Sequence, residues 1–142
     1  METLAQLQSE GKIRHVGLSN VSVEQLGTAR GIVPIASLQN RYNLMDRSSE
    51  DVLNVSERGG MGFIPWFPLA TGDVARKSGP LADIARAHGA APAQIALAWL
   101  LRRSPVMLPI PGTSSVQHLE ENMEAARVQL SDEEFQQLDH LA

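Results

Sequence analysis

Residues 13–20 read Ile13-Arg14-His15-Val16-Gly17-Leu18-Ser19-Asn20, a short, mostly apolar run that ends in a polar pair. Three similar runs follow at 34–38, 62–67 and 106–110. Each is bounded by Gly, Pro, Ser or Asn, which is typical of short buried strands. We therefore expect four strands, at 13–18 and at these three later segments.

The segments between these runs predict helices, because their apolar residues recur every three or four positions. Two helix starts carry the capping-box spacing, namely Ser22 with Gln25 and Ser131 with Glu134. Strands that alternate with helices favour parallel pairing, since a parallel neighbour needs a long crossover connection. The pattern predicts an α/β fold of four βα units in one sheet. An open doubly wound sheet and part of a (β/α)8 barrel both fit it, and periodicity does not separate them.

The composition sets the class of protein. The chain has 142 residues, 12 basic and 16 acidic side chains and no cysteine, which predicts one domain over 1–142 and excludes a disulfide scaffold and thiolate chemistry. The net charge of −4 and the lack of a basic cluster argue against nucleic acid as a partner. No apolar run is long enough to span a bilayer. We expect a soluble, cytoplasmic protein without a membrane partner.

Each predicted strand is followed at once by a polar or aromatic cluster. These clusters are Ser19-Asn20, Gln39-Asn40 with Tyr42-Asn43, Trp66-Phe67, and Gly112-Thr113-Ser114-Ser115. The carboxyl ends of parallel strands lie on one rim, so the four clusters should converge there. The plain alternative is that each cluster only forms a turn or caps a helix.

The residue types on this rim suit a nucleotide better than a sugar. Ser19, Asn20 and Gln39 offer hydroxyl and amide groups for a carboxamide, and Trp66 offers a ring for stacking. The loop 111–115 opens into a predicted helix, where backbone N–H groups favour an anion. An ordinary serine N-cap explains the same loop. No spacing typical of a metal site or of a serine-hydrolase elbow occurs.

At these positions the sequence resembles the aldo/keto reductase family, in particular its bacterial NADPH-dependent oxidoreductases. The resemblance rests on five stretches: Gly11-Lys12-Ile13-Arg14-His15-Val16-Gly17-Leu18-Ser19-Asn20, Gln39-Asn40-Arg41-Tyr42-Asn43, Pro65-Trp66-Phe67-Pro68-Leu69, Ile110-Pro111-Gly112-Thr113-Ser114-Ser115 and His118-Leu119-Glu120-Glu121-Asn122. It implies the C-terminal half of a (β/α)8 barrel, a bound NADPH, and carbonyl/alcohol redox by hydride transfer.

The resemblance also implies roles for individual positions. Ser19, Asn20 and Gln39 would hold the nicotinamide carboxamide, and Trp66 would stack on its ring. Pro68, Leu69 and the following Ala70-Thr71-Gly72-Asp73 would lie beside the pyrophosphate. The adenosine and 2′-phosphate end would be held by Gly112, Thr113, Ser114, His118, Glu121 and Asn122. Members of the family often have Lys where Gly112 stands and Arg where His118 stands, so the fixed positive charge for a 2′-phosphate is reduced here.

The family's catalytic Asp, Tyr, Lys and His lie in the first half of its barrel, and nothing in these 142 residues matches them. Tyr42 is the only tyrosine, and it belongs to the Gln39–Asn43 motif rather than to that tetrad. We therefore assign no catalytic residue and expect weak NADPH binding with little or no reductase activity. The alternative is a catalytically silent nucleotide-binding or scaffold half-barrel. Two unpaired strand edges and an open apolar concave face predict a homodimer or a complementary half-barrel partner.

Overall fold

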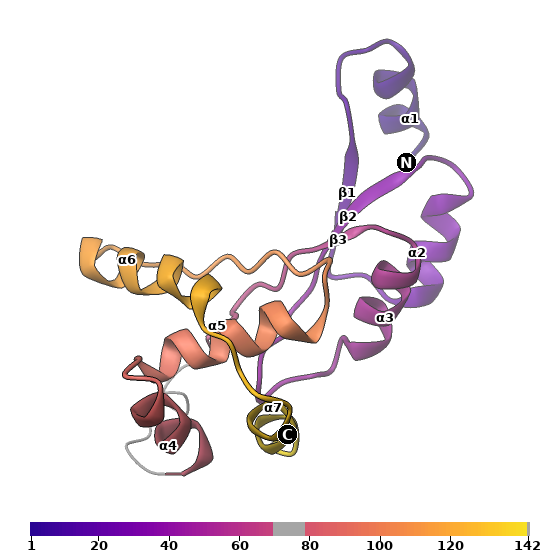
Figure 1. The fold of residues 1–142 in the computed structure, drawn as a ribbon. Helices are drawn as coiled ribbons and strands as arrows, with labels where there is room; N and C mark the ends of the chain where they lie inside the picture. Colours follow the sequence, from indigo (N-terminus) through magenta and orange to yellow (C-terminus); the bar gives the residue numbers. More distant parts are fainter. Residues whose placement is uncertain (70–78, 142) are drawn as a thin grey trace.

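A computed structural model describes residues 1–69 and 79–141 of the chain (Figure 1). Its sheet has three parallel strands in chain order: β1 (Val16–Ser19), β2 (Ile35–Gln39) and β3 (Gly62–Phe63). Adjacent parallel strands in sequential order are the arrangement of a barrel segment rather than of a doubly wound sheet, in which the order reverses. The prediction of an α/β fold with half-barrel topology is confirmed.

The fourth predicted strand, at 106–110, is not a strand in the structure, but the segment does lie beside β3 as predicted. Met107 forms a single parallel bridge with Phe63, where the Phe63 N–H donates to the Val106 carbonyl and the Leu108 N–H donates to the Phe63 carbonyl, both at 2.8 Å. The ladder is not continued, because the next N–H toward this segment would come from position 65, and Pro65 has none. The third predicted strand is also shorter than expected, since β3 ends at Phe63 and pairing resumes only at a bridge between Arg41 and Trp66.

The helices form where the apolar periodicity predicts them. They are α1 (Glu2–Ser9), α2 (Val23–Arg30), α3 (Glu50–Arg58), α4 (Pro80–Ala87), α5 (Pro92–Arg103), α6 (Val116–Glu124), the 3-10 turn η1 (Ala125–Arg127) and α7 (Asp132–Asp139). Both predicted capping boxes are present, at Ser22 and Ser131. In Figure 1, α2 and α3 lie together on one side of the strands, while α6 lies on the other side, apart from them.

The two faces of the sheet differ in composition. On one face Leu38 and Phe63 are fully buried in the core. The opposite face carries Gly17, Ser37 and Gly62, which are exposed or half-buried. A Cβ placed on Gly62 would meet Leu108 at 3.2 Å, so the 56% exposed Leu108 side chain lies on this open face too. The expectation of an apolar concave face is therefore wrong over β1–β3, where the open face carries small and polar residues. It becomes apolar only toward Leu108.

A cluster of aromatic side chains packs the C-terminal part of the chain against the core. Trp99 on α5 stacks against both Tyr42 and Phe135 of α7, with ring centroids 6.1 Å apart in each pair. Arg47 lies over the Trp99 ring, 4.5 Å from its centroid, and pairs with Asp139 at 2.7 Å. Such stacked rings add to the energy of apolar burial. Packing on Trp99 thus holds the loop after β2, which contains Tyr42 and Arg47, in place.

Candidate functional site

The first part of the candidate site lies at the carboxyl ends of β1 and β2. Ser19 and Gln39 are register partners on these adjacent strands, so their side chains point to the same side of the sheet. The Asn20 N–H donates to the Gln39 carbonyl at 2.9 Å, which extends the pairing by one residue. Ser19 is exposed and Gln39 is half-buried. Their hydroxyl and amide groups can therefore reach a ligand on the open face.

Two residues at this rim have left-handed backbones, which is uncommon for residues other than glycine. They are Asn20, with φ 54°, and Phe67, with φ 60°. Asn tolerates this conformation, whereas for Phe it stores strain of the kind found at functional sites. At Asn20 the turn brings the side-chain oxygen to the Trp66 indole, whose Nε1–H donates to it at 2.8 Å. Residues 46 positions apart in the chain thus meet at one rim.

Trp66 is held at this place by its backbone. The Trp66 N–H donates to the Asn40 carbonyl at 3.1 Å, beside the Arg41–Trp66 bridge. The side chain is half-buried, so part of the indole is open to a planar ligand. Pro68, which follows, is buried, and Leu69 packs against the core. Ala70-Thr71-Gly72-Asp73, expected beside a pyrophosphate, lie outside the described residues.

Asn40, Tyr42 and Asn43 support the rim rather than line it. Asn40 is 6% exposed, and its side chain exchanges hydrogen bonds with the Val21 backbone at 2.9 and 3.2 Å. The Asn43 amide donates to the Phe67 carbonyl at 3.1 Å. For these residues the turn-forming alternative is the correct one. Their burial could not be read from the sequence, because polar residues after a strand are usually exposed.

Tyr42 is fully buried, and its hydroxyl donates to Glu50, which also pairs with Arg103. Burial raises the pKa of Tyr42, and the hydrogen bond to Glu50 raises it further. The phenol is therefore a protonated structural donor. It is not a candidate proton donor for a bound ligand.

The second part of the candidate site is the loop before α6. Ser115 caps this helix, since its Oγ accepts from the His118 N–H at 3.4 Å, while Thr113 Oγ1 accepts from the Ser115 N–H at 3.1 Å. The serine-cap alternative is correct for Ser115. Gly112, Thr113, Ser114 and His118 are exposed, whereas Glu121 and Asn122 are half-buried. In Figure 1 this segment leads from the sheet toward α6, away from β1 and β2.

Arg41 is a rim residue that the sequence reasoning did not single out. Its guanidinium carbon lies 5.7 Å from the Trp66 ring centroid and 5.0 Å from that of Phe67, and its Nε pairs with Asp46 at 2.8 Å. A signal was available, because Arg41 follows Gln39 by two positions and so continues the same side of the strand. Hydrogen bonding from Ser48 lowers the pKa of Asp46, and Arg41 lowers it further, which keeps this carboxylate ionised.

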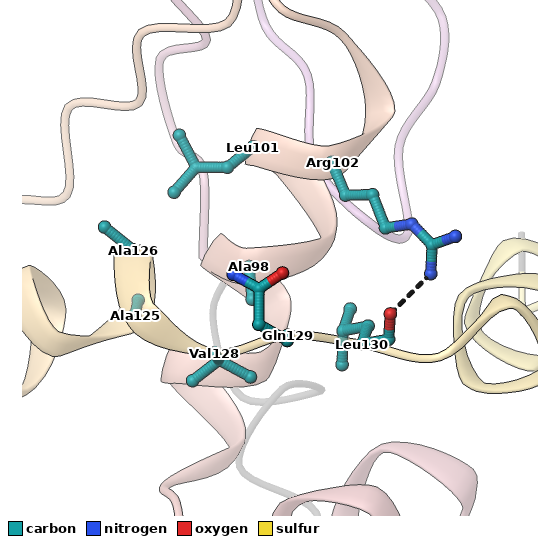
Figure 2. A pocket seen from close by; sticks show the side chains of 8 residues that line it. All are labelled: Ala98, Leu101, Arg102, Ala125, Ala126, Val128, Gln129 and Leu130. Carbon is teal, nitrogen blue, oxygen red and sulfur yellow. Dashed lines mark hydrogen bonds between the residues drawn. The ribbon is translucent and has the colours of Figure 1, made fainter.

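A hollow of about 390 Å³ lies elsewhere, between α5 and the segment that includes η1 and continues to Leu130 (Figure 2). Aliphatic side chains are among its lining residues, but the surface that lines it is mostly polar, and the Arg102 guanidinium beside it donates to the Leu130 and Ser131 carbonyls at 2.7 and 2.6 Å. None of the predicted site residues lines it. Within the described ranges, no cluster of three His, Cys, Asp or Glu side chains could hold a metal ion. Among the residues that the structure describes, no helix has the length and hydropathy to cross a membrane.

The chain is similar to curated oxidoreductases over nearly its whole length. It is 50% identical over 136 residues to an uncharacterized oxidoreductase of Schizosaccharomyces pombe, which covers 96% of this chain and 44% of that protein. It is 44% identical over 142 residues to pyridoxine 4-dehydrogenase of Escherichia coli, which covers 100% of this chain and 49% of that protein. The chain thus spans about half the length of the curated relatives it matches.

Solved structures show the same relation. An aldo/keto reductase of Klebsiella pneumoniae, crystallised with NADP and acetate, matches with a TM-score of 0.88 at 31% identity, over 99% of this chain and 52% of that one. Four parallel segments in sequential order, with the helices between them, therefore correspond to half of such a barrel enzyme. The sequence model of the aldo/keto reductase family matches residues 1–142. The chain belongs to the aldo/keto reductase family.

Proposed function

We propose that this chain carries the nicotinamide-binding half of an NADP(H)-linked aldo/keto reductase, with residues 1–142 as one domain. The proposal rests on one observation: Ser19, Gln39 and Trp66 lie together on the open rim, and Asn20 links the strand end to the indole. Bound NADPH supplies a hydride to a carbonyl group. The relatives crystallised with NADP and NADPH support this choice of cofactor.

The residues at the rim fit the nicotinamide end. The Asn20 oxygen is occupied by the indole N–H, so the Asn20 side chain presents its NH2 group as a donor. The Gln39 amide and Ser19 hydroxyl can each donate and accept, which matches the mixed polarity of a carboxamide. The half-buried Trp66 ring would bind the nicotinamide face by stacking. In this proposal these residues bind and orient the ring, and none of them is the proton donor for the carbonyl.

The phosphate end would be held by the loop before α6. Gly112, Thr113, Ser114, His118, Glu121 and Asn122 are the residues proposed here, with Pro68 and Leu69 beside the pyrophosphate. The loop offers hydroxyls and the N-terminal end of α6, but its nearest side chains carry little fixed positive charge. We expect weak binding, because few contacts offset the cost of immobilising a flexible dinucleotide.

For the 142-residue chain by itself we propose cofactor binding without carbonyl reduction. Transfer of a hydride to a carbonyl needs a positioned proton donor, and Tyr42 is committed to Glu50 in the core. The alternative, a silent nucleotide-binding or scaffold half-barrel, predicts the same inactivity. A pure scaffold binds no dinucleotide, so a binding measurement tests that form of the alternative, and an assay of NADPH-dependent aldehyde reduction tests whether the nucleotide-binding form is silent.

We also propose that two copies associate through their strand edges. Val106 and Leu108 face β3, so Met107 and Pro109 face the free edge, where Pro109 lacks an N–H and the Met107 N–H already donates to the Ser104 carbonyl. That edge therefore offers mainly carbonyl acceptors. On β1, the Asn20 N–H faces β2, so alternation places the N–H groups of Gly17 and Ser19 at the other free edge. The two edges are complementary, which favours a second copy over an unrelated partner.

The test is an NMR titration of the purified chain with NADPH, followed at the indole N–H signals. The chain has two tryptophans, and the Trp66→Phe variant assigns the Trp66 signal. We expect that signal to shift at up to millimolar NADPH, while the signal of buried Trp99 stays in place. Gln39→Leu should weaken binding by about tenfold, as expected for the loss of a buried hydrogen bond. Unchanged indole signals and no heat in calorimetry at millimolar NADPH would overturn the proposal.

A further inference from the structure

Arg41 and Asp46 form an ion pair next to the proposed stacking ring. We propose that this pair sets the preference of the site between the oxidised and the reduced nicotinamide, with Arg41 disfavouring the cationic ring and Asp46 offsetting it. The inference rests on the proposed function, because it takes Trp66 as the surface on which the nicotinamide stacks. It adds a specificity role for two residues that lie outside the expected set of binding positions.

The position of Arg41 is fixed from both ends. Its backbone forms the bridge to Trp66, and its Nε pairs with the Asp46 carboxylate at 2.8 Å. The guanidinium carbon lies 5.7 Å from the Trp66 centroid, within the range of a cation–π interaction. The phenyl ring of Phe67, which is held in the left-handed conformation, lies 5.0 Å from the same carbon. The positive charge is therefore held beside the indole, although about half of the Arg41 side chain remains exposed to solvent.

Asp46 is fixed equally well. Its N–H donates to the Asn43 carbonyl at 3.2 Å and to Asn43 Oδ1 at 3.0 Å, which closes a tight turn below the rim. Its carboxylate accepts from the Ser48 hydroxyl at 2.7 Å. The side chain of Asp46 is 29% exposed and that of Arg41 is 48% exposed. The pair is thus anchored on a folded turn and still open enough to act on a ligand through space.

The physical reason is the charge that distinguishes the two forms of the cofactor. The oxidised nicotinamide ring is a cation and the reduced ring is neutral, whereas the phosphates are the same in both. The ratio of the two dissociation constants therefore isolates the field at the ring. A unit charge roughly 9 Å from a stacked ring changes this ratio by about twofold in a water-like dielectric and about twentyfold at an effective dielectric of 20.

Removing the two charges separately should have opposite effects. Arg41→Met keeps an unbranched side chain over the indole but removes the cation, so NADP⁺ should bind more tightly relative to NADPH. Asp46→Asn keeps an acceptor for Ser48 but leaves the cation uncompensated, so NADP⁺ should bind more weakly relative to NADPH. Arg41→Lys keeps the charge and should change the ratio least. Both shifts should shrink as salt is raised, because these groups are partly exposed.

A matched control is available on α4, where Arg86 and Asp83 form an ion pair at 2.9 Å outside the site. Arg86→Met and Asp83→Asn make the same chemical changes and should leave the ratio unchanged. The measurement is the pair of dissociation constants for NADP⁺ and NADPH, taken from the Trp66 indole titration at low salt. Thermal unfolding of each variant checks that it is folded, and if Asp46→Asn is not, the comparison of Arg41→Met with Arg41→Lys decides.

The outcomes are distinguishable. Opposite shifts of at least twofold in the two rim variants, with unchanged controls, would support the proposal. An unchanged ratio in Arg41→Met would overturn this inference and leave the proposed function standing, provided that calorimetry still shows NADPH binding to be lost on Trp66→Ala. Failure of the unaltered chain to bind either form would overturn the proposed function and this inference with it.

Discussion

Asn20 shows how a single residue assembles the rim. Its left-handed backbone ends β1, and its side-chain oxygen then reaches the indole of Trp66 at 2.8 Å. Asn is one of the few residues other than glycine that adopts this conformation at low cost. Because the same side chain is proposed to contact the nicotinamide, the position needs both the backbone tolerance and the amide of Asn. Single positions at the phosphate end are less constrained, and Gly112 is the clearest case.

Gly112 can be replaced to test the missing charge. Its φ is not in the left-handed region, and a Cβ placed there would meet nothing within 4 Å. We expect Gly112→Lys combined with His118→Arg to fold normally and to bind NADPH about tenfold more tightly, with little effect on NADH, because the added cations face the 2′-phosphate. Calorimetric titrations with NADPH and NADH provide the comparison.

Gly112→Met with His118→Gln is the uncharged control for this pair of substitutions and should leave both affinities near those of the unaltered chain. Equal strengthening of NADPH and NADH binding would show that the cations act on the shared pyrophosphate. That result would remove the assignment of Gly112 and His118 to the 2′-phosphate end.

At the scale of elements, helix ends carry much of the local information. The capping box at the start of α7 is complete: the Ser131 N–H donates to Glu134 at 2.8 Å, and the Glu134 N–H donates to Ser131 Oγ at 3.2 Å. His88, which ends α4, reaches the same carboxylate at 2.9 Å. A single carboxylate therefore joins two helices that are far apart in sequence. Its ionisation links their packing to pH.

The hydrogen bond from the Ser131 backbone lowers the pKa of Glu134 below its usual value of 4.5, and His88 and Arg102 lower it further. A lowered folded-state pKa adds stability above pH 4.5 that is lost as pH falls through the folded value. Glu134→Gln keeps an acceptor for the Ser131 N–H and removes only the charge, so we expect it to be less stable than the unaltered chain by about 0.5 kcal/mol at pH 7. The difference should shrink as the pH falls below 4.5, as measured by urea unfolding. Glu133→Gln, in the same turn, is the control and should lose much less at pH 7.

At the scale of the whole molecule, the open sheet determines how the chain behaves in solution. Three strands and one bridged segment leave two free edges, one rich in carbonyl acceptors and the other offering N–H donors. The α6 helix also exposes Val116, Leu119 and Met123, at 73%, 53% and 68%. Apolar side chains three or four positions apart on one exposed helix face favour association.

We expect the purified chain to sediment as a dimer of about 31 kDa, twice its mass of 15.4 kDa. Ser19→Pro removes one of the two edge N–H donors on β1 and should shift the equilibrium toward monomer. Sedimentation equilibrium at micromolar concentration measures both, with circular dichroism to confirm folding. A folded monomer of the unaltered chain would contradict edge pairing, and a dimer unaffected by the substitution would place the interface elsewhere, for example on α6.

The local features of this protein can be predicted from its sequence alone. Capping boxes at Ser22 and Ser131, and the alternation of apolar runs with amphipathic helices, predict the elements correctly because they depend on neighbours within a few residues. The polar pair Ser19-Asn20 and the distant Gln39 and Trp66 are correctly predicted to converge, since parallel strands end on one rim.

Other features were decided only by tertiary structure. The segment 106–110 has the composition of a strand, yet it forms a single bridge, because Pro65, the next residue of the neighbouring segment that faces it, has no N–H to donate. The sequence places Tyr42 and Asn40 in one of the polar clusters at the rim, but in the structure both are buried and support the rim instead of lining it. Arg41 becomes a rim residue only because Trp66 and Asp46 are folded against it. In each case the decisive partner lies elsewhere in the chain, and sequence periodicity reports only on neighbours.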